Sequence, residues 1–303
     1  MPDWKQVQDK IALSPNPFDQ LRRNYLGIMH QYTGRNVIAY YSSFLQKPAI
    51  DGASIDDNDM NAFMQTVHCL DKSKGLDLLL HTPGGELHAA VSLIEYLHAI
   101  FGNNIRAFVP QLAMSAGTMI ALSCQEIVMG KQSAIGPIDP QFGGVSCSGV
   151  IEEFRKACEE ASLSQGALEM WKPIIGKYHP TFLGDCDNAI KWAGEVTTHW
   201  LEESMFANDN DSTQKANRIV SILLNHQETY FHGRHYHINE CKNLGIKVIE
   251  LESLDSKQID DCQDLQDCVL TIHHAYMQTL GSTNAIKIVE NHNGNAMVIS
   301  HQG

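Results

Sequence analysis

The stretch between residues 76 and 141 alternates short apolar runs with amphipathic runs, and this alternation constrains the fold more than any other feature of the chain. Three of its segments have the length and composition of buried strands: 76–81, 105–110 and 126–129. Two segments between them have apolar residues at helical spacing: 86–101 and 114–122. Short buried strands that alternate with helices are typical of an α/β fold. The sequence therefore predicts a mostly parallel sheet with helices packed on it.

The flanking segments extend this core, and nothing in them indicates a second domain or an internal repeat. We expect one domain over residues 1–303, with a strand at 36–41 and a hairpin across Asn293 and Gly294. Its four parts are a helical lead-in at 1–35, the core with the site at 36–145, a helical region at 146–230 and the C-terminal completion of the core at 231–303.

The composition excludes several classes of protein. Lysine and arginine total 22 and aspartate and glutamate 35, and the resulting net charge of −13 argues against nucleic-acid binding through phosphate neutralisation. No run approaches the roughly 18 apolar residues that a membrane helix needs, so we expect no transmembrane segment, while peripheral membrane association stays open. The start of the chain lacks the pattern of a signal peptide, so we expect a cytoplasmic protein.

The 15 histidines raise the question of a metal site. Their tightest group is His232, His235 and His237. A zinc site needs ligands that converge at fixed distances, and the chain has neither a His-Glu-x-x-His motif nor a Cys-x-x-Cys pair. We interpret this group as a polar turn and expect no metal. A dinucleotide-binding fingerprint is absent as well, so we expect no cofactor.

The turn Pro83-Gly84-Gly85 lies directly between a predicted buried strand and a predicted helix. Consecutive glycines adopt backbone angles that other residues avoid, and they leave their amide groups uncovered. Near a helix N-terminus such amides favour a phosphate or a developing oxyanion. The known phosphate-binding motifs do not fit this turn, and a purely structural strand-to-helix turn is an equal alternative.

The second turn, Ala113-Met114-Ser115-Ala116-Gly117, again follows a strand and opens an apolar helix. Its small residues place a serine at a crowded bend, as in the nucleophile elbow, although Ala113 stands where that motif has its first glycine. The common alternative for Ser115 is an ordinary N-cap. Adjacent parallel strands bring their carboxyl ends together, so both turns should meet at one edge of the sheet. There the amides of Gly85 and Ala116 would hold an oxyanion above Ser115.

Three motifs in this order resemble the ClpP/crotonase superfamily, and most strongly its serine dehydrogenase proteinase family, which is related to signal peptide peptidase A. The motifs are His-Thr-Pro-Gly-Gly at 81–85, Ala-Met-Ser-Ala-Gly-Thr at 113–118 and Gly-Pro-Ile-Asp-Pro-Gln at 136–141. The resemblance is strong over 36–145 and loose over 230–300.

The resemblance implies a repeated β-β-α spiral core with mostly parallel strands and an additional helical region. It also implies a serine peptidase that hydrolyses peptide bonds through an acyl-enzyme. Ser115 would be the nucleophile, and Gly84, Gly85 and Ala116 would bind the oxyanion and the substrate. The expected partners are a peptide or protein substrate and further copies of the chain in a homo-oligomer.

The general base is the open question. ClpP-type enzymes carry a histidine in the turn after the third strand, but here residues 134–138 contain none, so we expect no triad of that kind. Relatives of signal peptide peptidase A use a lysine, which can act as a base when burial lowers its pKa. We favour Lys177, with His179 as the competing base. The other candidate lysines after the third predicted strand are Lys156, Lys172 and Lys191.

Two other residues bear on the choice of the general base. Asn188 occupies the position where relatives carry their lysine, which puts a Ser-Lys dyad in question. We interpret Asp139 as a carboxylate that structures its turn. Two alternative functions follow from the same fold: a crotonase-type acyl-CoA enzyme, and a catalytically inactive oligomeric scaffold that has lost its base.

Overall fold

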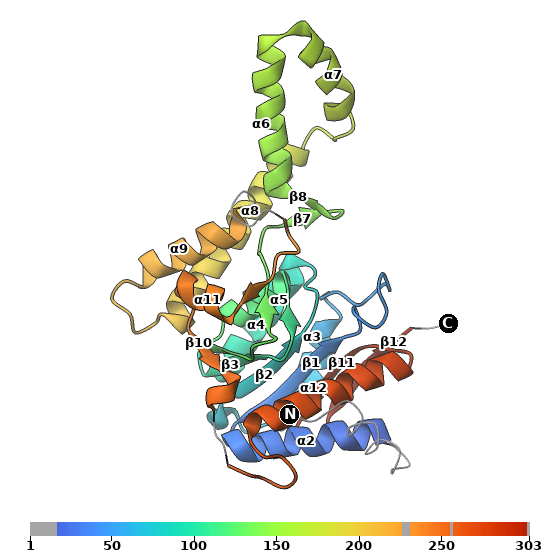
Figure 1. Ribbon diagram of the computed structural model, residues 1–303, viewed down its shortest axis with the longest axis vertical. Helices are drawn as coiled ribbons and strands as arrows, with labels where there is room; N and C mark the ends of the chain where they lie inside the picture. The colour runs from blue at the N-terminus through green and yellow to red at the C-terminus, as the bar shows by residue number, and fades with distance from the viewer. Residues whose placement is uncertain (1–16, 226–230, 255–256, 302–303) are drawn as a thin grey trace.

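The computed structural model describes residues 17–225, 231–254 and 257–301 (Figure 1). The predicted helical lead-in appears as α2 (Pro17–Thr33), and the part of that prediction over residues 1–16 lies outside the described residues. Within the described residues, none of the helices combines the length and apolar character needed to cross a membrane.

The core is a seven-stranded sheet in the order β10-β5-β3-β2-β1-β11-β12. The first five of these strands run parallel and the last two pair antiparallel, which confirms the mostly parallel sheet. The parallel strands are β1 (Asn36–Ser42), β2 (Leu76–His81), β3 (Ile105–Val109), β5 (Glu126–Met129) and β10 (Val248–Glu250). The predicted hairpin forms β11 (Ala285–Asn291) and β12 (Ala296–Ser300).

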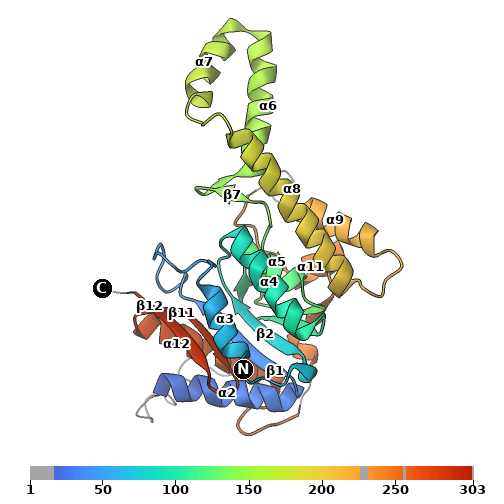
Figure 2. The same cartoon turned by 180° about the vertical axis from the view of Figure 1, so that it is seen from behind.

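Helices cover both faces of the sheet, because residues on both sides of its central strands are apolar (Figures 1 and 2). On one face lie α2 and α12 (Leu265–Ser282), which pack against Leu79 of β2. On the other face lie α3 (Asp59–Val67), α4 (Leu87–Phe101) and α5 (Ala116–Leu122), with α11 (Ile238–Leu244) at the β10 end. Short 3₁₀ turns span Lys72–Lys74 and Leu251–Ser253.

A small second sheet gives the fold its repeat. It contains β4 (Leu112–Ala113), β6 (Ala134–Ile135) and β9 (Tyr236–His237), and Thr82 extends it through a bridge to Ala113. Each of β2, β3 and β5 is followed by a short segment in this second sheet, and in the first two cases a helix comes next. This arrangement is the β-β-α spiral that the resemblance implied, and it stacks the Thr82 turn on the Ala113 turn.

The helical region contains the hairpin β7 (Gln141–Phe142) and β8 (Val145–Ser146), then α6 (Cys147–Leu163), α7 (Gln165–Ile175), α8 (Phe182–Trp200) and α9 (Ser212–Leu224). Helices α6 and α7 of the helical region project away from the sheet, whereas α8 and α9 lie against the core (Figures 1 and 2). Helix α7 was not among the predicted helices, and it begins where the side chain of Ser164 accepts a hydrogen bond from the amide of Ala167. A π-helical turn, Leu201–Met205, ends α8. The α8 end is fixed to the core where the Trp200 indole donates to Glu95 of α4.

Candidate active site

Ser115 lies at a strained bend between β4 and α5. Its backbone has φ 51° and ψ −118°, a combination that residues with a side chain rarely adopt. Although Ser115 is the N-cap residue of α5, its side chain makes no capping hydrogen bond. The ordinary N-cap interpretation therefore does not describe this serine. Its hydroxyl has no hydrogen-bond partner among the described residues and faces a cavity instead.

The glycine turn packs directly on this bend. A Cβ atom at Gly84, where φ is +96°, would lie 2.6 Å from both the Cβ of Ser115 and the carbonyl oxygen of Met114. A Cβ atom at Gly85 would lie 2.3 Å from the backbone nitrogen and oxygen of Ile55. Both glycines are required because backbone approaches them closely from opposite sides.

The amides of Gly85 and Ala116 have no acceptor among the described residues. The amide of Gly84, in contrast, donates to the Thr82 hydroxyl at 3.2 Å. Gly84 therefore contributes close packing, whereas Gly85 and Ala116 have amides available for a ligand. This placement agrees with the expectation that the two turns meet at the carboxyl ends of adjacent strands.

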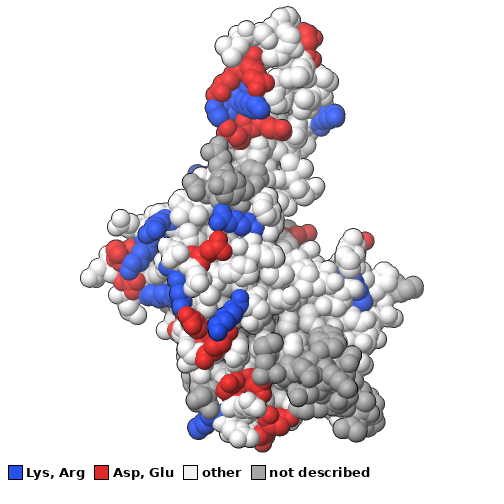
Figure 3. Space-filling model, in the orientation of Figure 1, with Lys and Arg blue, Asp and Glu red and all other residues white. Residues whose placement is uncertain are grey.

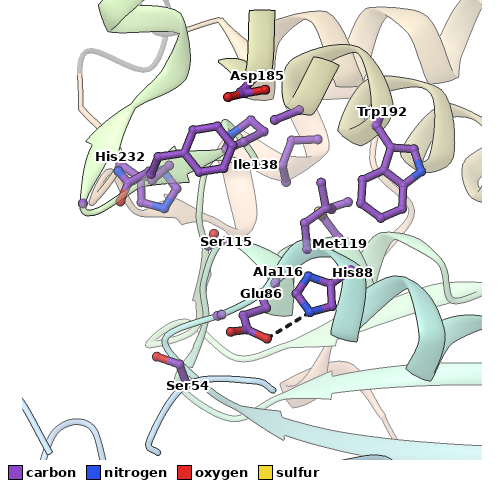
Figure 4. Close-up of a pocket in the computed structure, with 18 of the residues that line it drawn as sticks. Ser54, Glu86, His88, Ser115, Ala116, Met119, Ile138, Asp185, Trp192 and His232 are labelled. Carbon is purple, nitrogen blue, oxygen red and sulfur yellow. Dashed lines mark ion pairs between the residues drawn. The ribbon is translucent and has the colours of Figure 1, made fainter. Parts of the chain in front are cut away.

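Both turns line a cavity of about 1270 Å³ (Figure 4). Met119, Ile138 and Trp192 form an apolar part of its wall. Near the glycine turn the wall is polar, and His88 lies 3.1 Å from the Glu86 carboxylate. None of the described residues that line the cavity is a lysine or an arginine.

The structure does not place the predicted lysine base at the cavity. Lys177 is exposed and does not line the cavity. The other candidate lysines are also exposed, and each pairs with a nearby glutamate on its own helix: Lys156 with Glu160, Lys172 with Glu169 and Lys191 with Glu195. None of these four lysines lines the cavity that Ser115 faces, so the structure does not bring any of them to the serine.

His179, the competing base, does line the cavity. It is exposed, its Nδ1 lies 3.1 Å from the Thr181 hydroxyl, and its ring stands edge-on to Phe182. Asn188 lines the cavity as well, but its amide does not titrate. Of these two residues, only His179 has a group that can exchange a proton.

A third histidine at the cavity, His232, is held by a buried carboxylate. The Nδ1 of His232 lies 2.7 Å from Oδ1 of Asp139, whose side chain is fully buried. His232 is 24% exposed and lines the cavity with Ser115. The polar-turn interpretation of His232 and the turn-structuring interpretation of Asp139 are both incomplete, because a hydrogen bond joins the two side chains across 93 positions of the sequence.

The only sequence signal for this pair is that both residues belong to segments that resemble the same family. Neither shows a local pattern that predicts a partner, and the contact depends on the chain folding back after α9. In apo structures catalytic hydrogen bonds are often long, so the absent Ser115–His232 bond leaves His232 a candidate base.

The described residues contain no group of three or more histidine, cysteine, aspartate or glutamate side chains arranged to hold a metal. The cavity brings together a serine, two backbone amides and a histidine–carboxylate pair. These are the components of covalent acyl transfer.

Comparison with known proteins agrees with this geometry. Residues 40–172 match the family of ClpP-like SDH-type serine proteinases. This match confirms the resemblance found in the sequence, and the matched segment contains Ser115, both glycines and Asp139. His179 and His232 lie outside the matched segment. The family match therefore does not indicate which residue acts as the base.

The chain is also similar to two uncharacterized proteins of Methanocaldococcus jannaschii. One is 35% identical over 94 residues, which is 31% of this chain and 32% of that protein. The other is 30% identical over 206 residues, which is 68% of this chain and 62% of that protein. The chain thus spans less than two thirds of the length of either relative.

Proposed function

We propose that this protein is a serine peptidase that hydrolyses peptide bonds through an acyl-enzyme on Ser115, with His232 as the general base. The observation that carries the proposal is that a strained serine, two unbonded amides and a histidine bound to a buried carboxylate share one cavity. The family match supports the peptidase class. His232 takes the role that the sequence analysis gave to Lys177.

In the first step, Nε2 of His232 accepts the hydroxyl proton of Ser115 as Oγ attacks the substrate carbonyl carbon. The carbonyl oxygen becomes an oxyanion, to which the amides of Gly85 and Ala116 donate. When the intermediate collapses, the C–N bond breaks and His232 returns the proton to the leaving amine. A water molecule then attacks the acyl-enzyme by the same route. Asp139 keeps Nδ1 protonated, so that Nε2 is the basic nitrogen.

The residues that line the cavity favour a peptide as substrate over an acyl-CoA thioester. Coenzyme A carries phosphates that basic residues usually bind, and no described residue lining the cavity is basic apart from histidines. The apolar wall at Met119, Ile138 and Trp192 suits an apolar side chain of a peptide. On the face of the molecule that Figure 3 shows, basic and acidic side chains are interspersed.

The test is the rate at which a fluorophosphonate labels the protein, with mass mapping of the modified residue. We expect a label on Ser115 and none in Ser115→Ala. His232→Gln and Asp139→Asn should slow labelling by roughly 10²-fold or more, since general-base assistance contributes about that much. Because the histidine must be neutral to accept a proton, labelling should weaken in acid.

Lys177→Met is the matched control, and it should label at the wild-type rate. If Lys177→Met abolishes labelling while His232→Gln does not, the histidine mechanism is wrong. If His179→Gln abolishes labelling while His232→Gln does not, His179 is the base. No labelling of folded wild-type protein at any pH would favour the inactive scaffold.

A further inference from the structure

Lys287 of β11 is a buried lysine that the proposed mechanism does not use. Its side chain is 1% exposed and does not line the cavity. The ammonium group donates to the carbonyl oxygen of Ser54 at 2.9 Å and to Oδ2 of Asp56 at 3.1 Å. It also lies 2.8 Å from Oδ1 of Asp59, whose side chain is fully buried. The ammonium group of Lys287 thus contacts three residues between position 54 and the first residue of α3: Ser54, Asp56 and Asp59.

The carboxylate of Asp59 makes this cluster rigid. Its Oδ2 accepts hydrogen bonds from the Tyr40 hydroxyl at 2.9 Å and from the Asp56 amide at 3.0 Å. Tyr40 belongs to β1 and Lys287 to the neighbouring β11, where both are paired within the main sheet. The segment 54–56 is therefore held against two adjacent strands of the main sheet, β1 and β11, by buried polar contacts. Buried groups of this kind are costly to leave unpaired, so the segment has little freedom to move.

Residues 54–56 also fix the position of the Pro83-Gly84-Gly85 turn. The amide of Ile55 donates to the carbonyl oxygen of Gly84 at 2.8 Å, and the amide of Glu86 donates to the carbonyl oxygen of Ile55 at 2.9 Å. These bonds flank Gly85 on both sides, and the Ile55 backbone fills the place where a Cβ of Gly85 would lie. The direction of the Gly85 amide is consequently set by the position of residues 54–56.

We propose that Lys287 is a positioning residue that aims the Gly85 amide at the developing oxyanion through the segment 54–56. The inference rests on the proposed function, because it assigns that amide to the oxyanion. A misdirected donor weakens the transition state more than the bound substrate. Loss of Lys287 should therefore lower kcat and leave KM nearly unchanged.

Two variants test the proposal. Lys287→Met removes the cation, and the double variant Asp59→Asn with Lys287→Met also removes the buried charge that would be left behind, which protects folding. The matched control is Lys47→Met, since Lys47 donates to the carbonyl oxygens of Leu280 and Ala285 and does not contact residues 54–56. All proteins are compared below their measured unfolding temperatures.

The first measurement is hydrogen exchange at the amides of Ile55 and Glu86, which needs no activity. We expect exchange at these amides to be at least tenfold faster in both Lys287 variants than in wild type, and unchanged in Lys47→Met. Unchanged exchange in the folded Lys287 variants would overturn the proposal. This outcome does not depend on whether Ser115 is reactive, so it is separate from a failure of the proposed function.

The second measurement is the saturation kinetics of fluorophosphonate labelling or of peptide hydrolysis. We expect the limiting rate to fall by roughly 10- to 100-fold, less than the loss of a whole oxyanion donor, with a half-saturation constant within about threefold of wild type. The pH profile should keep its midpoint, because the base is untouched. A wild-type limiting rate in variants with faster exchange would also refute the positioning role.

Discussion

At the scale of the residue, the most informative feature is the backbone of Ser115. Its φ of 51° lies in a region that costs on the order of 1–3 kcal/mol for a residue with a Cβ. The strain persists because β4 and α5 are each fixed by pairing and packing on either side of the bend. It turns the hydroxyl away from a capping geometry and into the cavity.

This strain predicts different stabilities for two inactive variants. Ser115→Gly should be more stable to unfolding than Ser115→Ala by about 1 kcal/mol, because relief of strain exceeds the extra entropy of an unfolded glycine. Denaturant unfolding of both variants measures the difference. An alanine variant as stable as the glycine variant would show that the bend is not strained.

The close contact between the two turns predicts the effect of a single methyl group. Gly84→Ala should lower the free energy of unfolding by about 2–4 kcal/mol and abolish labelling, because its Cβ meets the carbonyl oxygen of Met114 and the Cβ of Ser115. The matched control is Gly52→Ala, where φ is +82° but no atom lies within 4 Å of the new Cβ. It should lose only about 1 kcal/mol and keep wild-type labelling. Equal effects of the two substitutions would refute the packing argument.

At the scale of the element, β1, β2 and α12 enclose a buried group of aromatic and histidine rings. His81 of β2 contacts Tyr41, Phe44 and His273, with ring centroids 5.5, 4.9 and 5.2 Å from its own. Neither nitrogen of His81 has a hydrogen-bond partner among the described residues. Burial therefore lowers the pKa of His81 from 6.5 to about 3, and the imidazole stays neutral in the folded protein.

This depressed pKa predicts acid sensitivity. Between pH 6.5 and about 3 the unfolded chain binds a proton at His81 that the folded chain does not, so stability falls as the pH falls through this window. His81→Phe should make the free energy of unfolding less dependent on pH by up to about 1.4 kcal/mol per pH unit. Burial and His81 lower the pKa of His273 as well, so part of the wild-type dependence should remain.

Urea unfolding at a series of pH values measures both slopes. The control is His68→Gln, which replaces an exposed histidine outside this buried group of rings. Parallel stability curves for wild type and His81→Phe would contradict the prediction.

At the scale of the whole molecule, the cavity lies between the sheet core and a helical region that has fewer buried contacts. Ser115 and the glycine turn belong to the sheet core, whereas Asp185, Ala189 and Trp192 reach the cavity from α8 (Figure 4). Helices α6 and α7 project beyond it, and only a small apolar cluster around Cys147, Val150 and Cys186 joins α6 to α8. Few buried contacts mean that this part opens at a lower free energy than the core.

We therefore expect limited proteolysis to cut first between α6 and α8, around residues 164 or 176–181, while the sheet core remains intact. Mass mapping of the early fragments gives the sites. Hydrogen exchange should likewise be fast over 147–180 and slow in β1, β2 and α12. Early cleavage within the main sheet would show that the helical region is not the less stable part.

The sequence by itself determined the features that depend on neighbouring residues. Hydrophobic periodicity placed the strands and helices between 36 and 145, because burial acts on each element through its own spacing. Ser115, Gly85 and Ala116 were also predictable, since each lies in a turn that ends a strand and begins a helix. The family resemblance rested on these same short motifs.

Only the tertiary structure decided which groups meet at the cavity from distant parts of the chain. Asp139 and His232 are 93 positions apart, and Lys287 reaches residues 54–59 from the other end of the sequence. A local pattern carries no information about such pairs, because their contact depends on how the elements pack. For the same reason the local sequence around Lys177 does not show that this lysine is exposed and lies outside the cavity lining.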